Sequence, residues 1–462
     1  MDFRMQSRHG FQTSLLAIML AFGVSSFPAA IAQETTNDGA TDAQALSDNI
    51  NEARDVVDSL ILALQNNPEL SSAQAEYMAT HRSQIVTFSN MLPQATAFAS
   101  QTYHKVGEDD PDFVYDEYED DNFGLRVSYD LFTSGKNLNA YRSKRADVRA
   151  QGHRRDGTEQ NVLLDAVTSH FDVLRDTAVL ALNEKNLDVL DRQLRAVKDR
   201  FEVGVVTRTD VAQSEARFAG ARSSLIAAQT ALQASRAFYE RTVGVPAMGL
   251  TNTSSLPELP ATLDDATAIA RSESPILNAA REGARGAKLT AYSQIGAALP
   301  QVKIAGTYTR YDNQTPIANV RLEEGEVYEV SATVTVPIFT GFRNAATISA
   351  ARYAASALTQ SVHATANVVD ERVIVAWHTN SAANAVITAR NEQIKASEIA
   401  LEGVRQENSL GTRTTLDVLD AEQALLDARV DLVRAQRDQS VAAYGLLSSV
   451  GRLSGQLFAR GE

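Results

Sequence analysis

A short motif occurs twice in this chain, and the two copies stand 207 residues apart. The second copy, at 408–420, reads NSLGTRTTLDVLD, and the first, at 201–213, reads FEVGVVTRTDVAQ. Each copy holds a glycine, followed after a few residues by a Thr and an Asp that suit the start of a helix. The same offset relates two LPQ tripeptides, at 92–94 and 299–301. The chain is therefore a tandem repeat, with the helix-turn glycines Gly204 and Gly411 at matching places.

Proline is absent from two long stretches, 112–245 and 338–462. Because proline breaks helix interiors, these stretches can form long helices, and their richness in Ala, Leu, Arg, Gln and Glu favours them. In the first repeat we expect helices at about 136–201 and 209–243. The longer one would measure about 98 Å at 1.5 Å per residue. Its apolar residues recur every three or four positions, as in a coiled coil.

Each repeat also contains two segments with alternating apolar and polar residues. We expect strands at about 94–106 and 122–132, and again at about 301–312 and 328–338. This alternation and length are typical of outer-membrane barrel strands, although a half-buried sheet in a soluble domain alternates in the same way. Four strands cannot close a transmembrane barrel, and bare strand edges are costly in lipid. If the strands cross a membrane, several chains must share one barrel.

The N-terminus has the pattern of a secretory signal peptide at 1–32. Arg4 and Arg8 precede an apolar run that is too short to span a membrane, and a small-x-small cleavage pattern ends at Ala32. In the remaining chain we expect a flexible N-terminal segment at 33–50, the first structural repeat at 51–243, a connector at 244–265, the second structural repeat at 266–451, and a C-terminal tail at 452–462.

Composition excludes several classes of function. The formal net charge of −14 makes nucleic acid a poor partner, and the absence of Cys excludes thiol chemistry and Cys-ligated metals. The seven His residues have no metal-type spacing, and there is no Gly-rich phosphate loop with a Lys. The sequence therefore predicts no enzyme, no cofactor and no metal site.

The chain resembles the TolC family of outer-membrane channel proteins. The resemblance rests on GTRTTLDVLDA at 411–421, VPIFTG at 336–341, the LPQ tripeptides and the duplicated strand–strand–helix–turn–helix plan. It implies an α+β membrane protein: a long coiled-coil-like helical barrel, plus four strands per chain in a shared transmembrane β-barrel. It also implies a homotrimer in outer-membrane lipid with a large periplasmic portion.

The resemblance further implies the exit duct of a tripartite efflux or type I secretion system, exporting drugs, small molecules or secreted proteins. Its partners would be a periplasmic adaptor (membrane fusion) protein and an inner-membrane RND or ABC transporter. A periplasmic coiled-coil adaptor or structural protein is the alternative interpretation.

For the second turn the resemblance implies a periplasmic gate ring of Asp417 and Asp420. Gate-closing contacts would involve Arg413, Asp210 and Thr209, whereas the tyrosine that locks other family members is replaced by Asn408. A structural role is equally open for two of these residues. With Thr414 or Thr207 as N-cap, Asp417 or Asp210 stands at the third helical position, which favours an acidic side chain. Asp420 has no such capping role.

An acidic loop at 108–121 holds nine carboxylates. As a connection between two strands, it is expected to face the outside of the cell. It is either a solvated loop or a divalent-cation site at the lipopolysaccharide surface.

Overall fold

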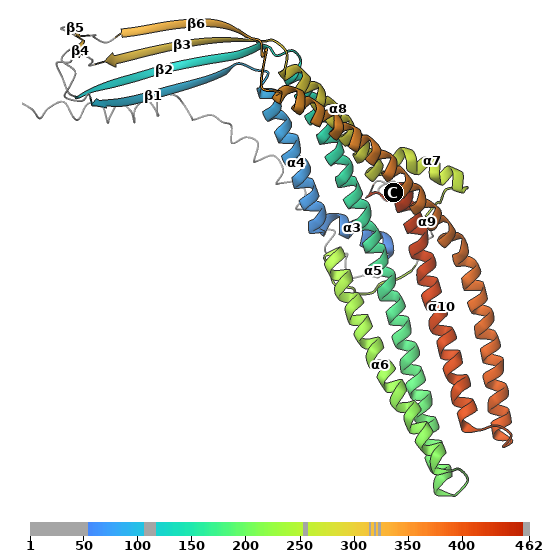
Figure 1. Ribbon diagram of the computed structural model, residues 1–462. Helices are drawn as coiled ribbons and strands as arrows, with labels where there is room; N and C mark the ends of the chain where they lie inside the picture. The colour runs from blue at the N-terminus through green and yellow to red at the C-terminus, as the bar shows by residue number, and fades with distance from the viewer. Residues whose placement is uncertain are drawn as a thin grey trace, which may run out of the picture. The chain divides into compact units, whose positions relative to one another are not determined.

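The computed structural model describes residues 54–105, 117–252, 257–313, 316–317, 320–321 and 325–455. The predicted signal peptide, the segment 33–50 and most of the acidic loop lie outside these residues. From Asp55 onward the described residues belong to one compact unit. Its four-stranded sheet lies at one end, and two helical hairpins extend to the other (Figure 1).

The two repeats have the same order of elements. The first contains α3 (Val56–Asn66), α4 (Pro68–Ser89), β1 (Gln94–Lys105), β2 (Glu117–Phe132), α5 (Lys136–Glu202) and α6 (Arg208–Val243). The second contains α7 (Leu263–Glu273), α8 (Pro275–Ala297), β3 (Gln301–Asn313), β6 (Gly325–Thr335), α9 (Arg343–Ser409) and α10 (Thr415–Val450). Each helix of the first repeat begins 207 residues before its counterpart, so the predicted internal repeat is confirmed.

Element boundaries differ from expectation in three places. Helix α7 begins inside the expected connector, at Leu263, as the counterpart of α3. Strand β2 begins at Glu117, within the acidic loop, because its first residues pair with the end of β1. Strand β6 spans Gly325–Thr335 and not 328–338: it begins three residues earlier, and it ends earlier since Pro337 has no backbone N–H to donate. Two short strands, β4 (Pro316–Ile317) and β5 (Val320–Arg321), pair with each other between β3 and β6.

The sheet has the antiparallel order β1-β2-β3-β6, so its central pair joins the two repeats. Directly opposed side chains share a face of a sheet. One row across the four strands is apolar: Ala97, Leu125, Tyr308 and Tyr328. The adjacent row, on the other face, is polar in all four strands: Thr96, Arg126, Thr307 and Glu329. In the middle of the sheet the alternation therefore gives one apolar and one polar face. The next row toward the loops is mixed: Arg310 and Glu326 lie on the mainly apolar face, and Phe98 and Val327 lie on the other.

Helices α5 and α9 have 67 residues each, about 100 Å at the usual rise per residue. Helix α6 runs beside the part of α5 farthest from the sheet, and α10 runs beside the corresponding part of α9 (Figure 1). Nearer the sheet, α8 packs along α5, where Ser143 Oγ donates to the Gly286 carbonyl at 2.9 Å. No helix in the described part of the chain combines the length and apolar character needed to cross a membrane.

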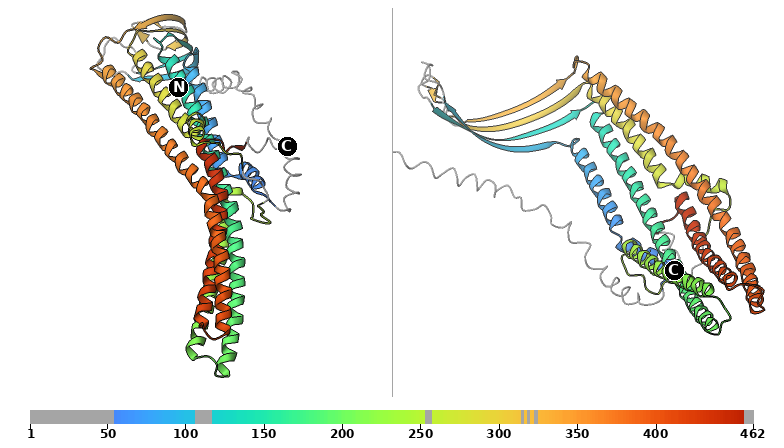
Figure 2. Two further views of the ribbon diagram at one scale, coloured as in Figure 1. Left: turned by 90° about the vertical axis from the view of Figure 1, so that its right-hand side faces the viewer. Right: turned by 60° about the horizontal axis from the view of Figure 1, so that its bottom comes forward.

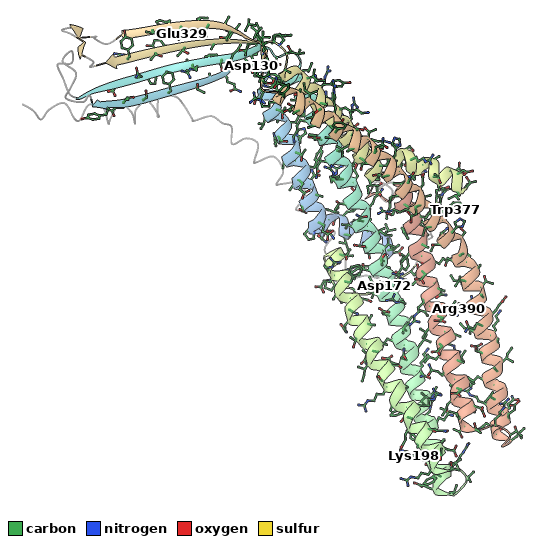
Figure 3. The ribbon with its side chains drawn as sticks, in the orientation of Figure 1. Asp130, Asp172, Lys198, Glu329, Trp377 and Arg390 are labelled. Atoms are coloured by element: carbon green, nitrogen blue, oxygen red, sulfur yellow. The ribbon has the colours of Figure 1, made fainter. Side chains whose placement is uncertain are left out.

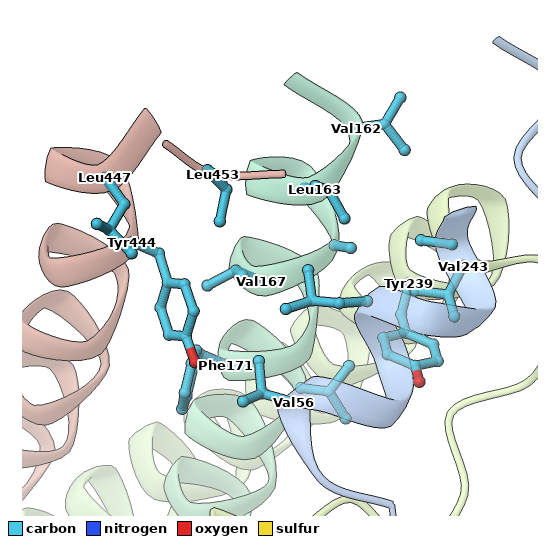
Figure 4. Packing of buried hydrophobic residues seen from close by; sticks show 14 of the residues in the cluster. Val56, Val162, Leu163, Val167, Phe171, Tyr239, Val243, Tyr444, Leu447 and Leu453 are labelled. Carbon is cyan, nitrogen blue, oxygen red and sulfur yellow. The ribbon is translucent and has the colours of Figure 1, made fainter. Parts of the chain in front are cut away.

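The main core lies where α3 meets α5, α6 and the end of α10 (Figure 4). Leu60, Leu163 and Val243 are fully buried there. Leu453 joins them, so the first residues of the expected C-terminal tail are packed into the core. Arg452 also forms a two-bond ion pair with Glu273, at 2.8 and 2.9 Å.

A buried polar network runs through this core. The Oγ atom of Ser59 lies 2.9 Å from Nδ1 of His170 and 2.8 Å from the hydroxyl of Tyr239. Burial lowers the pKa of His170, which favours the neutral ring. Its Nε2–H then donates to the Thr251 carbonyl at 3.0 Å, and Nδ1 accepts from Ser59. The histidine thus joins α3, α5, α6 and the connector without a buried charge.

Candidate functional site

Both hairpins end in a five-residue turn, far from the sheet (Figure 2). The turns are 203–207 between α5 and α6, and 410–414 between α9 and α10. Gly204 has φ +76° and Gly411 has φ +77°, a left-handed conformation that costs other residues energy. Each glycine is followed by an amide that donates back across the turn: Val205 to the Arg200 carbonyl at 2.9 Å, and Thr412 to the Glu407 carbonyl at 3.0 Å.

Each helix after a turn begins with a capping box. The Thr207 amide donates to the Asp210 carboxylate at 2.8 Å, and the Asp210 amide donates to the Thr207 hydroxyl oxygen at 3.3 Å. Thr414 and Asp417 form the same pair of bonds, at 2.8 and 3.2 Å. Both aspartates therefore have the structural role that their spacing allowed.

The hydrogen bonds and the charge around Asp417 also change the pKa of its carboxyl group. Hydrogen bonds from the Thr414 hydroxyl and amide, and the nearby charge of Arg413, lower the pKa of Asp417. Its carboxylate remains ionised at neutral pH. An exposed negative charge therefore lies at the second tip.

Arg413 is held within its own turn. Its Nε donates to the Glu407 carboxylate at 2.9 Å, and Nη1 lies 4.0 Å from the Asp417 carboxylate. Asn408 donates through Nδ2 to the Arg413 carbonyl at 2.8 Å. These bonds tie the end of α9 to the start of α10.

Asp420 forms an ion pair with Arg217 of helix α6. The pair joins the second hairpin to the first, across 203 positions of sequence. The neighbouring Leu419 is 2% exposed and packs against Leu190 and Ala221 of the first hairpin. Asp420, which has no capping role, therefore has an electrostatic partner in the other repeat.

The predicted gate-closing residues are not brought together within one chain. Arg413 contacts Glu407, Asp210 contacts Thr207, and Thr209 is exposed. Sequence reasoning missed Arg217 and Glu407. The available signal was the lack of a capping role for Asp420, which left its charge in need of a partner. Among the described residues, no group of three or more His, Asp or Glu side chains is arranged to hold a metal ion.

The fold defines a two-repeat protein with a shared four-stranded sheet and two long helical hairpins. The chain belongs to the Outer membrane efflux protein family, which matches residues 60–242 and 268–452. These two ranges correspond to the two repeats. Membership confirms the predicted resemblance and an outer-membrane location, and it identifies a transport duct for efflux or secretion, not an enzyme.

Known proteins are similar along most of the chain. The outer membrane efflux protein BepC of Brucella suis biovar 1 (strain 1330) is 30% identical over 396 residues, covering 86% of this chain and 85% of BepC. The outer membrane protein TolC of Vibrio cholerae serotype O1 is 26% identical over 407 residues, covering 85% and 90%. The crystal structure of the Campylobacter jejuni CmeC outer membrane channel has the same fold, with a TM-score of 0.76 at 15% identity, covering 86% of this chain and 85% of CmeC.

Proposed function

We propose that three copies of this chain form one duct that carries substrates across the periplasm and the outer membrane. The sheet is the observation that carries the proposal. Its register collects apolar side chains on one face, and within the described strands β1 and β6 have a strand partner on one side only. Sheets of three copies, joined edge to edge, would close a barrel with its apolar face toward lipid.

Exposed apolar side chains on the helices support self-assembly. On α9, Tyr353 is 77% exposed and Ile399 is 75% exposed, and on α4 Val86 is 67% exposed. Extended apolar surface of this kind is uncommon on monomeric soluble proteins. We propose that α4 and α9 of neighbouring copies cover each other in a helical tunnel through the periplasm.

The proposed partners are a periplasmic adaptor protein and an inner-membrane RND or ABC transporter. The proposed cargo is drugs and other small molecules, which is supported by the 30% identity to a protein named for efflux. Secreted proteins are the alternative cargo.

Expression in a strain without its own efflux duct, together with a matching adaptor and pump, is expected to restore drug tolerance. Restored secretion of a protease without drug tolerance would contradict the efflux cargo.

Cysteine crosslinking tests the shared barrel, and the natural chain has no Cys to interfere. Ala97→Cys on β1, combined in turn with Cys at each position of 327–334 on β6, is expected to yield oxidised trimers in detergent extracts. The control Ser128→Cys/Ala305→Cys joins directly opposed residues of one sheet and is expected to yield monomers only. Monomers from every edge pair would refute the shared barrel, and release by salt wash alone would favour the adaptor interpretation.

We further propose that the second tips of the three copies form the periplasmic gate. Asp417 and Asp420 would bring six carboxylates to one ring, which attracts cations. Arg413, Asp210 and Thr209 would supply contacts between neighbouring copies that hold the gate closed. In planar bilayers, Asp417→Asn and Asp420→Asn are expected to weaken block by multivalent cations, and Arg413→Gln or Asp210→Asn to raise conductance. An unchanged cation response would rule out the ring.

A further inference from the structure

The two hairpins of one chain are linked by charged side chains at two levels. At the first, the Asp172 carboxylate accepts from Arg175 at 2.7 Å and from Arg437 of α10 at 2.8 Å. Asp176 beside it binds Arg175 and the hydroxyl of Ser235. Burial by itself would raise the pKa of Asp176, but these hydrogen bonds outweigh it and lower the pKa. This level is part-buried and lies partway along α5 (Figure 3).

The second level lies nearer the tips. It consists of the Arg217–Asp420 ion pair and the contact of Leu419 with Leu190 and Ala221. Here the charged side chains are accessible, at 40% for Arg217 and 56% for Asp420. Ions from solution can therefore reach this pair.

Between the two levels lies a pocket that is open to solvent. This pocket, of about 680 Å³, lies among α5, α6 and α10. Helix α6 contributes small side chains to it, namely Ser224, Ala227, Ala228 and Ala231. On the tip side of the main core, in which α10 packs against α5, the Arg217–Asp420 level is therefore the link between the hairpins that lies nearest the tips.

We propose that Arg217 and Asp420 form a clamp, within each chain, that holds the second hairpin against the first when the entrance is closed. Multivalent cations compete with Arg217 for the Asp420 carboxylate. The inference rests on the proposed channel function and assigns the control of its entrance. Arg217 is a positioning residue here, since it acts through Asp420 and the position of α10.

Three consequences distinguish the clamp from a ring of unpaired carboxylates. Removing Arg217 both releases the hairpin and frees a carboxylate, so conductance and cation affinity rise together. Removing Asp420 raises conductance but lowers cation affinity. High salt, which screens exposed charges, weakens the clamp in the natural chain and has little effect once Arg217 is gone.

The test compares Arg217→Gln, Asp420→Asn and the exchanged pair Arg217→Asp/Asp420→Arg in planar bilayers. An exposed pair shifts an equilibrium by about threefold, so three chains opening together would give about a 30-fold higher open probability for each single variant. The exchanged pair is expected to return most of the closed state. The matched control is Lys198→Gln, which breaks an ion pair of 2.8 Å and similar exposure with Glu215 inside the first hairpin, and is expected to leave open probability unchanged.

Open probabilities of Arg217→Gln equal to those of the natural chain would overturn the clamp, as would an equal effect of Lys198→Gln. An exchanged pair that opens as readily as the single variants would also overturn it. These outcomes differ from failure of the proposed function, in which the natural chain itself forms no channel and restores no drug tolerance.

Discussion

The two tips of the molecule share a backbone and differ in almost every exposed side chain. Both have a left-handed glycine, a Thr cap and an Asp at the third helical position. The first tip exposes Val203 and Val205, at 74% and 71%. At the second tip, Glu407, Arg413 and Asp417 form a charged group. After duplication, the turn's conformational requirements were kept while its surface diverged.

The comparison separates the interactions that form the turn from the charged side chains that distinguish the second tip. Hydrogen bonds between residues a few positions apart form the turn in both repeats. The charges of the second tip, and the link from Asp420 to Arg217, are found within the described residues only in the second repeat's turn region, and the proposed entrance would respond to ions through them. The two tips are therefore expected to respond alike to changes in the turn and differently to changes in charge.

Replacing either tip glycine with Ala is expected to have the largest effect. The left-handed conformation costs a non-glycine residue about 1–2 kcal/mol, so amide exchange around 205–212 or 412–419 should accelerate about 5- to 30-fold. Gly220→Ala, within helix α6 where no atom opposes a Cβ, is the control and is expected to stabilise. If Gly→Ala accelerated amide exchange at only one of the two tips, the two turns would not have the same conformational requirement.

Removing the cap hydroxyl is expected to have the next largest effect, and again an equal one at both tips. Thr207→Ala and Thr414→Ala should each destabilise the following helix by about 1 kcal/mol. Hydrogen exchange in the first turn of α6 and of α10 measures this. Thr→Ser at the same positions keeps the hydroxyl and should behave like the natural chain. If Thr→Ser destabilised the following helix as much as Thr→Ala, loss of the hydroxyl hydrogen bond would not be the cause of the destabilisation.

The ion pair of the second tip should distinguish the tips, with a smaller effect. Glu407→Gln removes the partner of Arg413, and an exposed pair contributes about 0.2–1 kcal/mol. Arg200→Gln, at the corresponding position of the first tip, is the control and should change its turn less. The difference should vanish in about 1 M salt, where charges are screened within about 3 Å. A difference that persists there would argue against an electrostatic cause.

Acid should have the smallest effect, and only below the usual range of a carboxyl group. The hydrogen bonds from Thr414 and the charge of Arg413 hold the pKa of Asp417 below its ordinary value, so the contribution of this carboxylate to stability is complete above the ordinary carboxyl pKa and is lost as pH falls through the folded-state pKa. Chemical-shift titration of the Asp417 carboxyl measures this midpoint. Thr414→Ala removes the hydroxyl that donates to Asp417, so this substitution should raise the titration midpoint of the Asp417 carboxyl. An unmoved midpoint would show that the cap does not set the pKa.

Much of this architecture could be predicted from sequence because its causes are local or periodic. Proline-free stretches allow helices of 67 residues, and Pro68 and Pro275 each begin a helix after a break. Alternation predicted the strands, but not the start of β2 inside the acidic loop, which depends on pairing with β1. At the tips, the glycines and capping boxes followed from spacing, because their bonds join residues three to five positions apart.

The sequence by itself determined the duplication, the long helices, the apolar face of each strand and the backbone of both tips. Tertiary structure decided which strands of the two repeats pair, how Ser59 and Tyr239 satisfy a buried His170, and that Arg217 is the partner of Asp420. The physical reason is distance along the chain. Turns and caps are selected by neighbouring residues, whereas the Arg217–Asp420 pair spans 203 positions and forms only after packing has placed α6 beside α10.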